Sequence, residues 1–244
     1  PVVVTRFKEE GKEAGCFVTD AAGRRYLLKL DLPQYPELVT GAEAVASKLL
    51  YALGYYVPSY EIVEVPQEQL RVSPSLPAGS DARLAAMIRP RVRDGRIRAS
   101  ASRILEGEIL GPFRFKQFRH CSELRALRLA YAWLNNTDAK DHNTLMVWTG
   151  ERTIGYLIDF GTSLGGHGER GPKGSCQGWV YDVDLAEGVF ELLTLGLHDE
   201  GCDRRERPIS PAVGLWSARF DPRRWKPYAP NLAFQDMTDA DATW

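Results

Sequence analysis

Long apolar runs are missing from this 244-residue sequence. No stretch approaches the roughly 20 residues needed to span a bilayer, and residues 1–11 lack the basic region and cleavage pattern of a signal peptide. We therefore expect no membrane span, and we favour the cytoplasm for the chain as given while leaving the compartment open. The chain begins with Pro1 rather than Met, so we expect it to be an excerpt of a longer protein.

An excess of charge of either sign is also missing. The 31 basic and 32 acidic residues give a formal net charge of -1, so no overall field attracts nucleic acid or an anionic membrane. We expect no nucleic-acid partner, and any phosphate chemistry must come from a local site. The cysteines are few, far apart and without the spacing of metal ligands, which favours free thiols and leaves one or two disulfides as the alternative. They are Cys16, Cys121, Cys176 and Cys202.

The composition that remains is that of a globular protein with strands and helices. Apolar residues run or alternate over 2–7, 16–20 and 25–30, which predicts three antiparallel strands. Prolines break the chain after them, and helical spacing predicts a helix over 41–53. At its start, Thr40 and Glu43 have the spacing of a capping box.

The following segments complete a β-rich first lobe. A strand is expected at 60–65, and residues 66–84 are rich in Pro, Ser and Gly, which predicts a loop. Strand-like patterning resumes at 86–90 and 101–105. We expect this lobe to span residues 1–108.

The second part, residues 109–244, changes character. Apolar residues recur at helical spacing from Ser122 to Leu134, which predicts a helix. The segments 144–148 and 153–158 are joined by Thr-Gly-Glu-Arg, which predicts a β-hairpin, and a further helix is expected around 183–195.

The hairpin has a chemical consequence. If its strands pair about a turn near residue 151, Asn143 and Asp159 face each other at its open end. An amide oxygen and a carboxylate with few other ligands suit Mg²⁺, which keeps several waters and is completed by substrate phosphates.

These motifs resemble those of a known family. Residues 138–143, Asp-Ala-Lys-Asp-His-Asn, followed by Ile-Asp-Phe-Gly at 158–161, resemble the catalytic loop and magnesium-binding motif of the protein-kinase-like superfamily. The resemblance implies an α+β, two-lobed kinase-like fold with a β-rich N-lobe (1–108) and a mainly helical C-lobe (109–244). It covers about residues 3–200.

The resemblance also implies roles in the first lobe. Lys29 would hold the α- and β-phosphates of ATP and pair with Glu43. Gly11 and Gly15, in the turn between the first two predicted strands, are the candidate nucleotide contacts of the phosphate loop, although the turn lacks Gly-x-Gly-x-x-Gly.

In the second lobe the resemblance implies the catalytic groups. Asp138 would accept the proton of the incoming nucleophile, and Lys140 would stabilise charge on the γ-phosphate. Asn143 and Asp159 would bind Mg²⁺, with Mn²⁺ as an alternative ion. Asp141 is a rival for the role of base.

The departures from the family pattern indicate which branch the chain resembles. Asn136 and Thr137 replace the usual His-Arg, and no Ala-Pro-Glu segment follows. The chain is therefore more similar to the atypical bacterial branch, which includes HipA-like and spore-coat kinase-like proteins, and to phosphoinositide kinases.

The sequence leaves several functions open. The leading prediction is ATP- and Mg²⁺-dependent phosphoryl transfer to a hydroxyl of an unknown protein or small-molecule acceptor. The alternatives are transfer of AMP by the same fold, a small-molecule kinase of the aminoglycoside or choline type, and an inactive scaffold that binds partners. The oligomeric state is open.

Overall fold

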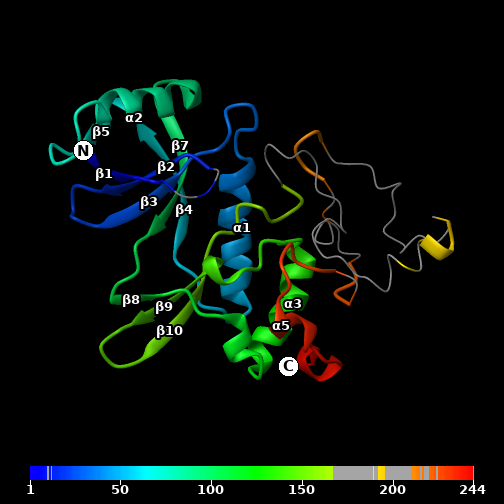
Figure 1. The fold of residues 1–244 in the computed structure, drawn as a ribbon. Helices are drawn as coiled ribbons and strands as arrows, with labels where there is room; N and C mark the ends of the chain where they lie inside the picture. Colours follow the sequence, from blue (N-terminus) through cyan, green and yellow to red (C-terminus); the bar gives the residue numbers. More distant parts are fainter. Residues whose placement is uncertain are drawn as a thin grey trace. The chain divides into compact units, whose positions relative to one another are not determined.

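The computed structural model describes residues 1–9, 11, 13–166, 189, 192–195, 210–214, 216, 220–223 and 225–243 (Figure 1). The chain divides into two compact units. The first contains Pro1–Gly111 and Leu145–Gly161, and the second contains Pro112–Thr144 and Thr162–Trp244. The lobes 1–108 and 109–244 stay a prediction. Most of the helix expected at 183–195 lies outside the described residues, as do Cys176 and Cys202.

A mixed seven-stranded sheet forms most of the first unit, in the order β4-β7-β3-β2-β1-β5, with β6 paired to β7. β1 and β5 are parallel, and the other pairs are antiparallel. The three strands predicted at the start of the chain are confirmed. The strands are β1 (Val2–Phe7), β2 (Gly15–Thr19), β3 (Arg25–Lys29), β4 (Tyr60–Pro66), β5 (Leu70–Val72), β6 (Val92–Arg93) and β7 (Arg96–Arg103).

The loop predicted for residues 66–84 is wrong. This segment contains the 3-10 turn η1 (Gln67–Gln69), the edge strand β5 and most of α2 (Ser80–Ile88), which is followed by η2 (Arg89–Arg91). Leu84 and Ile88 lie four residues apart on α2 and are buried against one face of the sheet. Most of the Pro, Ser and Gly residues that indicated a loop lie at 73–79, in the connection between β5 and α2.

The helix α1 (Leu38–Ala52) begins earlier than predicted, so Thr40 and Glu43 do not form a capping box. Its first turn is capped by Asp31, which follows β3 in the chain. The Asp31 Oδ1 accepts hydrogen bonds from the backbone N–H groups of Val39 and Thr40, both at 2.9 Å, and the Thr40 hydroxyl donates to Oδ2 at 2.6 Å. A carboxylate at a helix N-terminus satisfies donors that the helix itself leaves unpaired.

A second, smaller sheet confirms the predicted hairpin. It has the order β10-β9-β8, with β8 (Glu108–Gly111), β9 (Thr144–Trp148) and β10 (Thr153–Leu157). The Thr149 N–H donates to the Arg152 carbonyl at 3.0 Å and closes the turn between β9 and β10.

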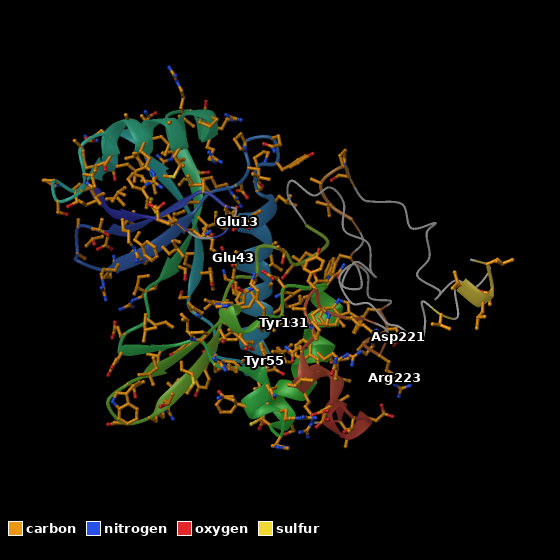
Figure 2. All side chains as sticks on the ribbon, in the orientation of Figure 1. Glu13, Glu43, Tyr55, Tyr131, Asp221 and Arg223 are labelled. Atoms are coloured by element: carbon orange, nitrogen blue, oxygen red, sulfur yellow. The ribbon has the colours of Figure 1, made fainter. Side chains whose placement is uncertain are left out.

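The second unit is built around α3 (Ser122–Leu134), the helix predicted there. The residue after it, Asn135, has a φ of 49°, which ends the helix. Tyr131 on α3 (Figure 2) is fully buried and meets the ring of Phe234 edge-on. Helical segments described in the second unit also include η3 (Phe115–Phe118), η4 (Asp141–Asn143), α5 (Leu232–Gln235) and η7 (Asp239–Ala242).

The described residues therefore show an α+β protein with a mixed sheet and a small second sheet. Within that part of the chain, no helix combines the length and the apolar character required to cross a membrane.

Candidate functional site

Lys29 lies at the centre of a buried ion-pair network in the first unit. Its Nζ is 2.6 Å from Oε1 of Glu43 and 2.7 Å from Oδ1 of Asp159. The side chains of Lys29 and Glu43 are 6% and 0% exposed, and that of Asp159 is 35% exposed. β3, α1 and the segment after β10 each supply one member, so residues up to 130 positions apart in the sequence meet at one ammonium group.

The electrostatics of this network follow from its burial. Burial alone would lower the pKa of Lys29, but the carboxylates of Glu43 and Asp159 raise it well above its ordinary value. Burial raises the pKa of Glu43, while Lys29 opposes that shift. Lys29 therefore holds two carboxylates at one buried ammonium group.

Two residues that sequence reasoning missed hold the carboxyl-bearing residues of the network. The Ser100 hydroxyl donates to Oε2 of Glu43 at 2.7 Å, and Tyr60 accepts a hydrogen bond from the Asp159 N–H through its hydroxyl at 3.4 Å. Ser100 is paired directly with Lys29 across β3 and β7. Only a prediction of the register between β3 and β7 could have identified Ser100 from the sequence.

The Asp-Phe-Gly segment is fixed within the same unit. Asp159 has a φ of 66°, an uncommon value for a residue other than glycine. Phe160 is fully buried, and its ring meets that of Tyr60 edge-on at 5.8 Å. A Cβ atom at Gly161 would lie 2.5 Å from Cγ1 of Val39 on α1, so a side chain at this position would require Val39 to shift.

In the turn between β1 and β2, the side chain of Lys8 lies close to both predicted nucleotide contacts, Gly11 and Gly15. Gly11 has a φ of 80°, and a Cβ there would lie 2.5 Å from Nζ of Lys8. A Cβ at Gly15 would lie 2.5 Å from the Leu28 carbonyl oxygen and 3.4 Å from Cδ of Lys8. The positive φ accounts for Gly11, and close packing against the Leu28 backbone accounts for Gly15. Their contact with a nucleotide stays a prediction.

The second unit brings together the residues expected in a catalytic loop. Oδ2 of Asp138 accepts hydrogen bonds from Nζ of Lys140 and Nδ2 of Asn143, both at 2.9 Å. Nδ2 of Asn143 also donates to the Asp138 carbonyl at 2.8 Å. Asn143 is buried, and with its nitrogen so bound its remaining polar atom is the acceptor Oδ1.

Asp141 has a structural role in the same loop. Its Oδ1 accepts a hydrogen bond from the Phe115 N–H at 3.0 Å, and its carbonyl accepts one from the Thr144 hydroxyl at 2.6 Å. These contacts anchor the short turn η4.

Asp159 and Asn143 carry side-chain oxygen atoms of the kind that bind Mg²⁺. Among the described residues, no group of three or more His, Cys, Asp or Glu side chains comes together as a metal centre. Mg²⁺ does not require such a group, because one or two protein oxygens, waters and substrate phosphates complete its octahedron. Asp159 offers carboxylate oxygens and Asn143 offers Oδ1, but these two residues belong to different units. Their joint site stays a prediction.

Comparison with known proteins adds no family to this description. A scan against models of protein families found no match, and a search of curated proteins found no match either.

Proposed function

We propose that this protein is an ATP- and Mg²⁺-dependent phosphotransferase with an atypical two-lobed kinase-like fold, acting on a hydroxyl of a protein or small-molecule acceptor. The observation that carries the proposal is the contact of Lys29 with both Glu43 and Asp159. Lys29, which the resemblance assigns to phosphate binding, and Asp159, one of the two residues it assigns to metal binding, are thus in contact in the first unit.

The stability of the folded protein alone does not explain why these three charged side chains meet in its interior. Removing charges from water costs several kcal/mol per ion, and buried ion pairs are often replaced by apolar residues at no loss of stability. A network at the end of β3 that keeps the carboxylate of Asp159 35% exposed is better explained by a binding role. This supports Asp159 as a metal ligand.

Each residue has a role in the proposed reaction. Lys29, oriented by Glu43, would bind ATP phosphates, and Asp159 with Asn143 would hold Mg²⁺. A bound Mg²⁺ supplies neutralisation of the phosphate charge. Asp138 would orient the acceptor hydroxyl and take its proton, and Lys140, now 2.9 Å from Asp138, would turn to the transferred phosphoryl group.

An inactive binding scaffold is the second candidate, and one observation favours it. The turn between β1 and β2 is packed around the Lys8 side chain and lacks the glycine-rich sequence that cradles phosphates in kinases. AMP transfer would use the same residues, and the mass of the product distinguishes it from phosphoryl transfer.

Calorimetry of ATP binding with and without Mg²⁺ tests the proposal. We expect ATP to bind more tightly with Mg²⁺ and Asp159→Asn to lose that dependence. Asp94→Asn is the matched control, because Asp94 also has a positive φ, 48°, and lies in the β6–β7 turn. The same dependence on Mg²⁺ in Asp159→Asn and wild type would remove the metal assignment.

The mass of the product decides between the activities. After incubation with Mg-ATP and candidate acceptors, we expect a phosphoryl increment on the acceptor or on the protein itself. An AMP increment would establish nucleotidyl transfer instead. ATP binding without either product, across protein and small-molecule acceptors, would favour the scaffold.

A further inference from the structure

Four arginines alternate along η2 and the β6–β7 hairpin and share one face of it. They are Arg91, Arg93, Arg96 and Arg98. The register pairs Val92 with Ile97 and Arg93 with Arg96, and its continuation places Arg91 opposite Arg98. Directly paired residues point to the same face of an antiparallel pair, and successive residues alternate. Because Val92 and Ile97 pack into the core that α2 covers, the arginines lie on the other face.

A cavity of about 210 Å³ lies on that face of the hairpin. All four arginines line it, together with residues of the segment between β3 and α1, among them Asp31, Pro33 and Pro36. Its volume is below the roughly 300–1,000 Å³ of pockets that hold drug-sized ligands. A small ion therefore fits this cavity better than a nucleotide. The lining residues include neither Lys29 nor its two carboxylate partners.

Two of the four arginines are compensated by carboxylates. Arg98 donates to Oδ2 of Asp31 at 3.2 Å, and the same carboxylate caps α1. Nε of Arg96 lies 3.4 Å from Oε2 of Glu64, and these two side chains are 50% and 60% exposed. The first pair is therefore part of the fold, and the second is an exposed pair of the kind that contributes little energy.

The other two arginines, Arg91 and Arg93, form no ion pair with a carboxylate in the described part of the chain. Arg91 donates from Nε to the Asp31 carbonyl and from Nη1 to the Met87 carbonyl, both at 2.6 Å, and Arg93 donates to the Val92 carbonyl at 3.0 Å. Burial lowers the pKa of Arg91, and the Asp31 carboxylate opposes that shift. A partly buried cation has lost hydration that only an opposite charge replaces well.

The cavity wall also carries two carboxylates that would repel an anion, those of Glu37 and Asp94. Both residues are exposed, and neither forms an ion pair with a described arginine. Exposed charges are screened by water and salt, whereas Arg91 is partly buried. The partly buried charge that is left without an ion-pair partner is therefore positive.

We propose that this cavity binds a phosphate monoester dianion, held between Arg91 and Arg93. The two residues are one position apart on an extended segment, about 7 Å along the chain, so their guanidinium groups can approach one ion from two sides. A planar fork of N–H donors matches phosphate oxygens in pairs. A single carboxylate has the charge and oxygens for one fork, whereas a phosphate dianion has them for two. The inference does not depend on the proposed function.

Calorimetry with methyl phosphate tests the site, in magnesium-free buffer of low ionic strength at about pH 7.5. A phosphate monoester has its second pKa near about 6 and is mostly a dianion there. Dimethyl phosphate, which has one charge, should bind more weakly. We expect Arg93→Met to weaken binding of methyl phosphate about tenfold, the scale of one hydrogen bond to a charged group, and Arg93→Lys to recover part of that loss. Glu64→Gln, which frees Arg96, should tighten binding.

The choice of Arg93 keeps the fold out of the comparison. Its side chain is exposed, and among the described residues it donates only to the carbonyl of the preceding residue. Arg71→Met is the matched control. Arg71 is exposed on β5, donates to the Leu70 carbonyl at 2.9 Å in the same way, and does not line the cavity.

Three results would overturn the site. They are the absence of saturable binding of methyl phosphate by wild type, equal affinity of Arg93→Met and wild type, and an equal loss in Arg71→Met, because attraction by general surface charge needs no cavity. Succinate that binds as tightly as methyl phosphate would remove the phosphate assignment.

A further titration identifies what carries the phosphate. A short phosphoserine peptide that binds more tightly than methyl phosphate, and loses its affinity when dephosphorylated, assigns the site to a phosphorylated side chain. Equal affinity of the two probes assigns it to a small phosphate ester. Mg-ATP is titrated into Arg93→Met as well, and we expect no change from wild type. A loss of Mg-ATP binding in this variant would show that the cavity holds nucleotide phosphates and would overturn the small-ion assignment.

Discussion

The Tyr60 hydroxyl accepts a hydrogen bond from the backbone N–H of Asp159 at 3.4 Å, and the Tyr60 ring packs edge-on against the next residue, Phe160. Asp159 has a positive φ, so its backbone depends on such contacts. Tyr60 is 5% exposed, and burial raises the pKa of its hydroxyl, which therefore stays protonated at neutral pH.

Removal of this hydroxyl should make the backbone of Asp159 less rigid without creating a cavity in the core. We expect Tyr60→Phe to raise the Mg²⁺ concentration needed for ATP binding while ATP affinity without Mg²⁺ is unchanged. The lost hydrogen bond should cost about 1 kcal/mol of stability. Calorimetry at several Mg²⁺ concentrations measures this, with Tyr56→Phe as the control. A loss of stability with an unaltered Mg²⁺ dependence would give Tyr60 a structural role only.

The buried ion pair predicts strong energetic coupling between Lys29 and Glu43. Lys29→Met leaves two carboxylates near each other, and Glu43→Met leaves Lys29 with Asp159 alone. Each should lower the free energy of unfolding by about 3–5 kcal/mol. The double variant should lose less than the sum, because no unpaired charge remains from the Lys29–Glu43 contact. Urea denaturation measures the cycle, and additive losses would contradict the coupling.

Gly161 predicts a packing conflict with α1. Gly161→Ala places a methyl group 2.5 Å from Cγ1 of Val39 and should cost about 1–3 kcal/mol of stability. Adding Val39→Ala should recover part of that loss. Gly41→Ala is the control, because a Cβ there meets nothing within 4 Å and alanine favours the helix by about 1 kcal/mol. Equal effects of the two glycine substitutions would show that Val39 does not limit the segment.

The second unit should lose stability in acid through Asp241. Its carboxylate accepts hydrogen bonds from Arg125, the larger cause, and from Thr238, which hold its pKa well below the ordinary value. A lowered pKa adds stability above the unfolded pKa of about 4, and this stability is lost as the pH falls below it. Thermal denaturation between neutral pH and about pH 3 should therefore show a weaker acid dependence in Asp241→Asn. The exposed neighbour Asp239, replaced by Asn, should leave the dependence unchanged.

Thiol reactivity should separate the two described cysteines. Cys16 is 2% exposed, and burial raises its pKa to about 12, whereas Cys121 is exposed. Because the thiolate is the reactive form, iodoacetamide at about pH 8 should modify Cys121 and leave Cys16 intact in the folded protein. Peptide mapping measures the modification at each site, and urea should expose Cys16. Labelling of Cys16 in the native protein would show that β2 opens readily.

The amino-acid sequence by itself determined the elements that depend on local pattern. Alternating apolar residues and tight turns specified β1, β2, β3 and the hairpin of β9 and β10, because a period of two and a turn signal are local properties. Helical spacing specified α3. The candidate residues were found through the spacing of 138–143 and 158–161.

Tertiary structure decided the role of Glu43. Its spacing from Thr40 allows a capping box, and its chemistry allows an ion pair, so the local sequence fits both. Asp31 caps α1 instead, which leaves Glu43 in the helix interior facing Lys29 and Ser100. The choice depends on a carboxylate at the end of another strand, and no local pattern contains that information.

The same reason explains why Gly15, at the start of β2, is paired with Lys29, at the end of β3, while its carbonyl accepts a hydrogen bond from the Lys8 N–H. In the sequence these three residues are well separated. Only the register of the strands brings them side by side, and that register is set by the buried residues Phe7, Cys16 and Leu28 rather than by the lysines themselves.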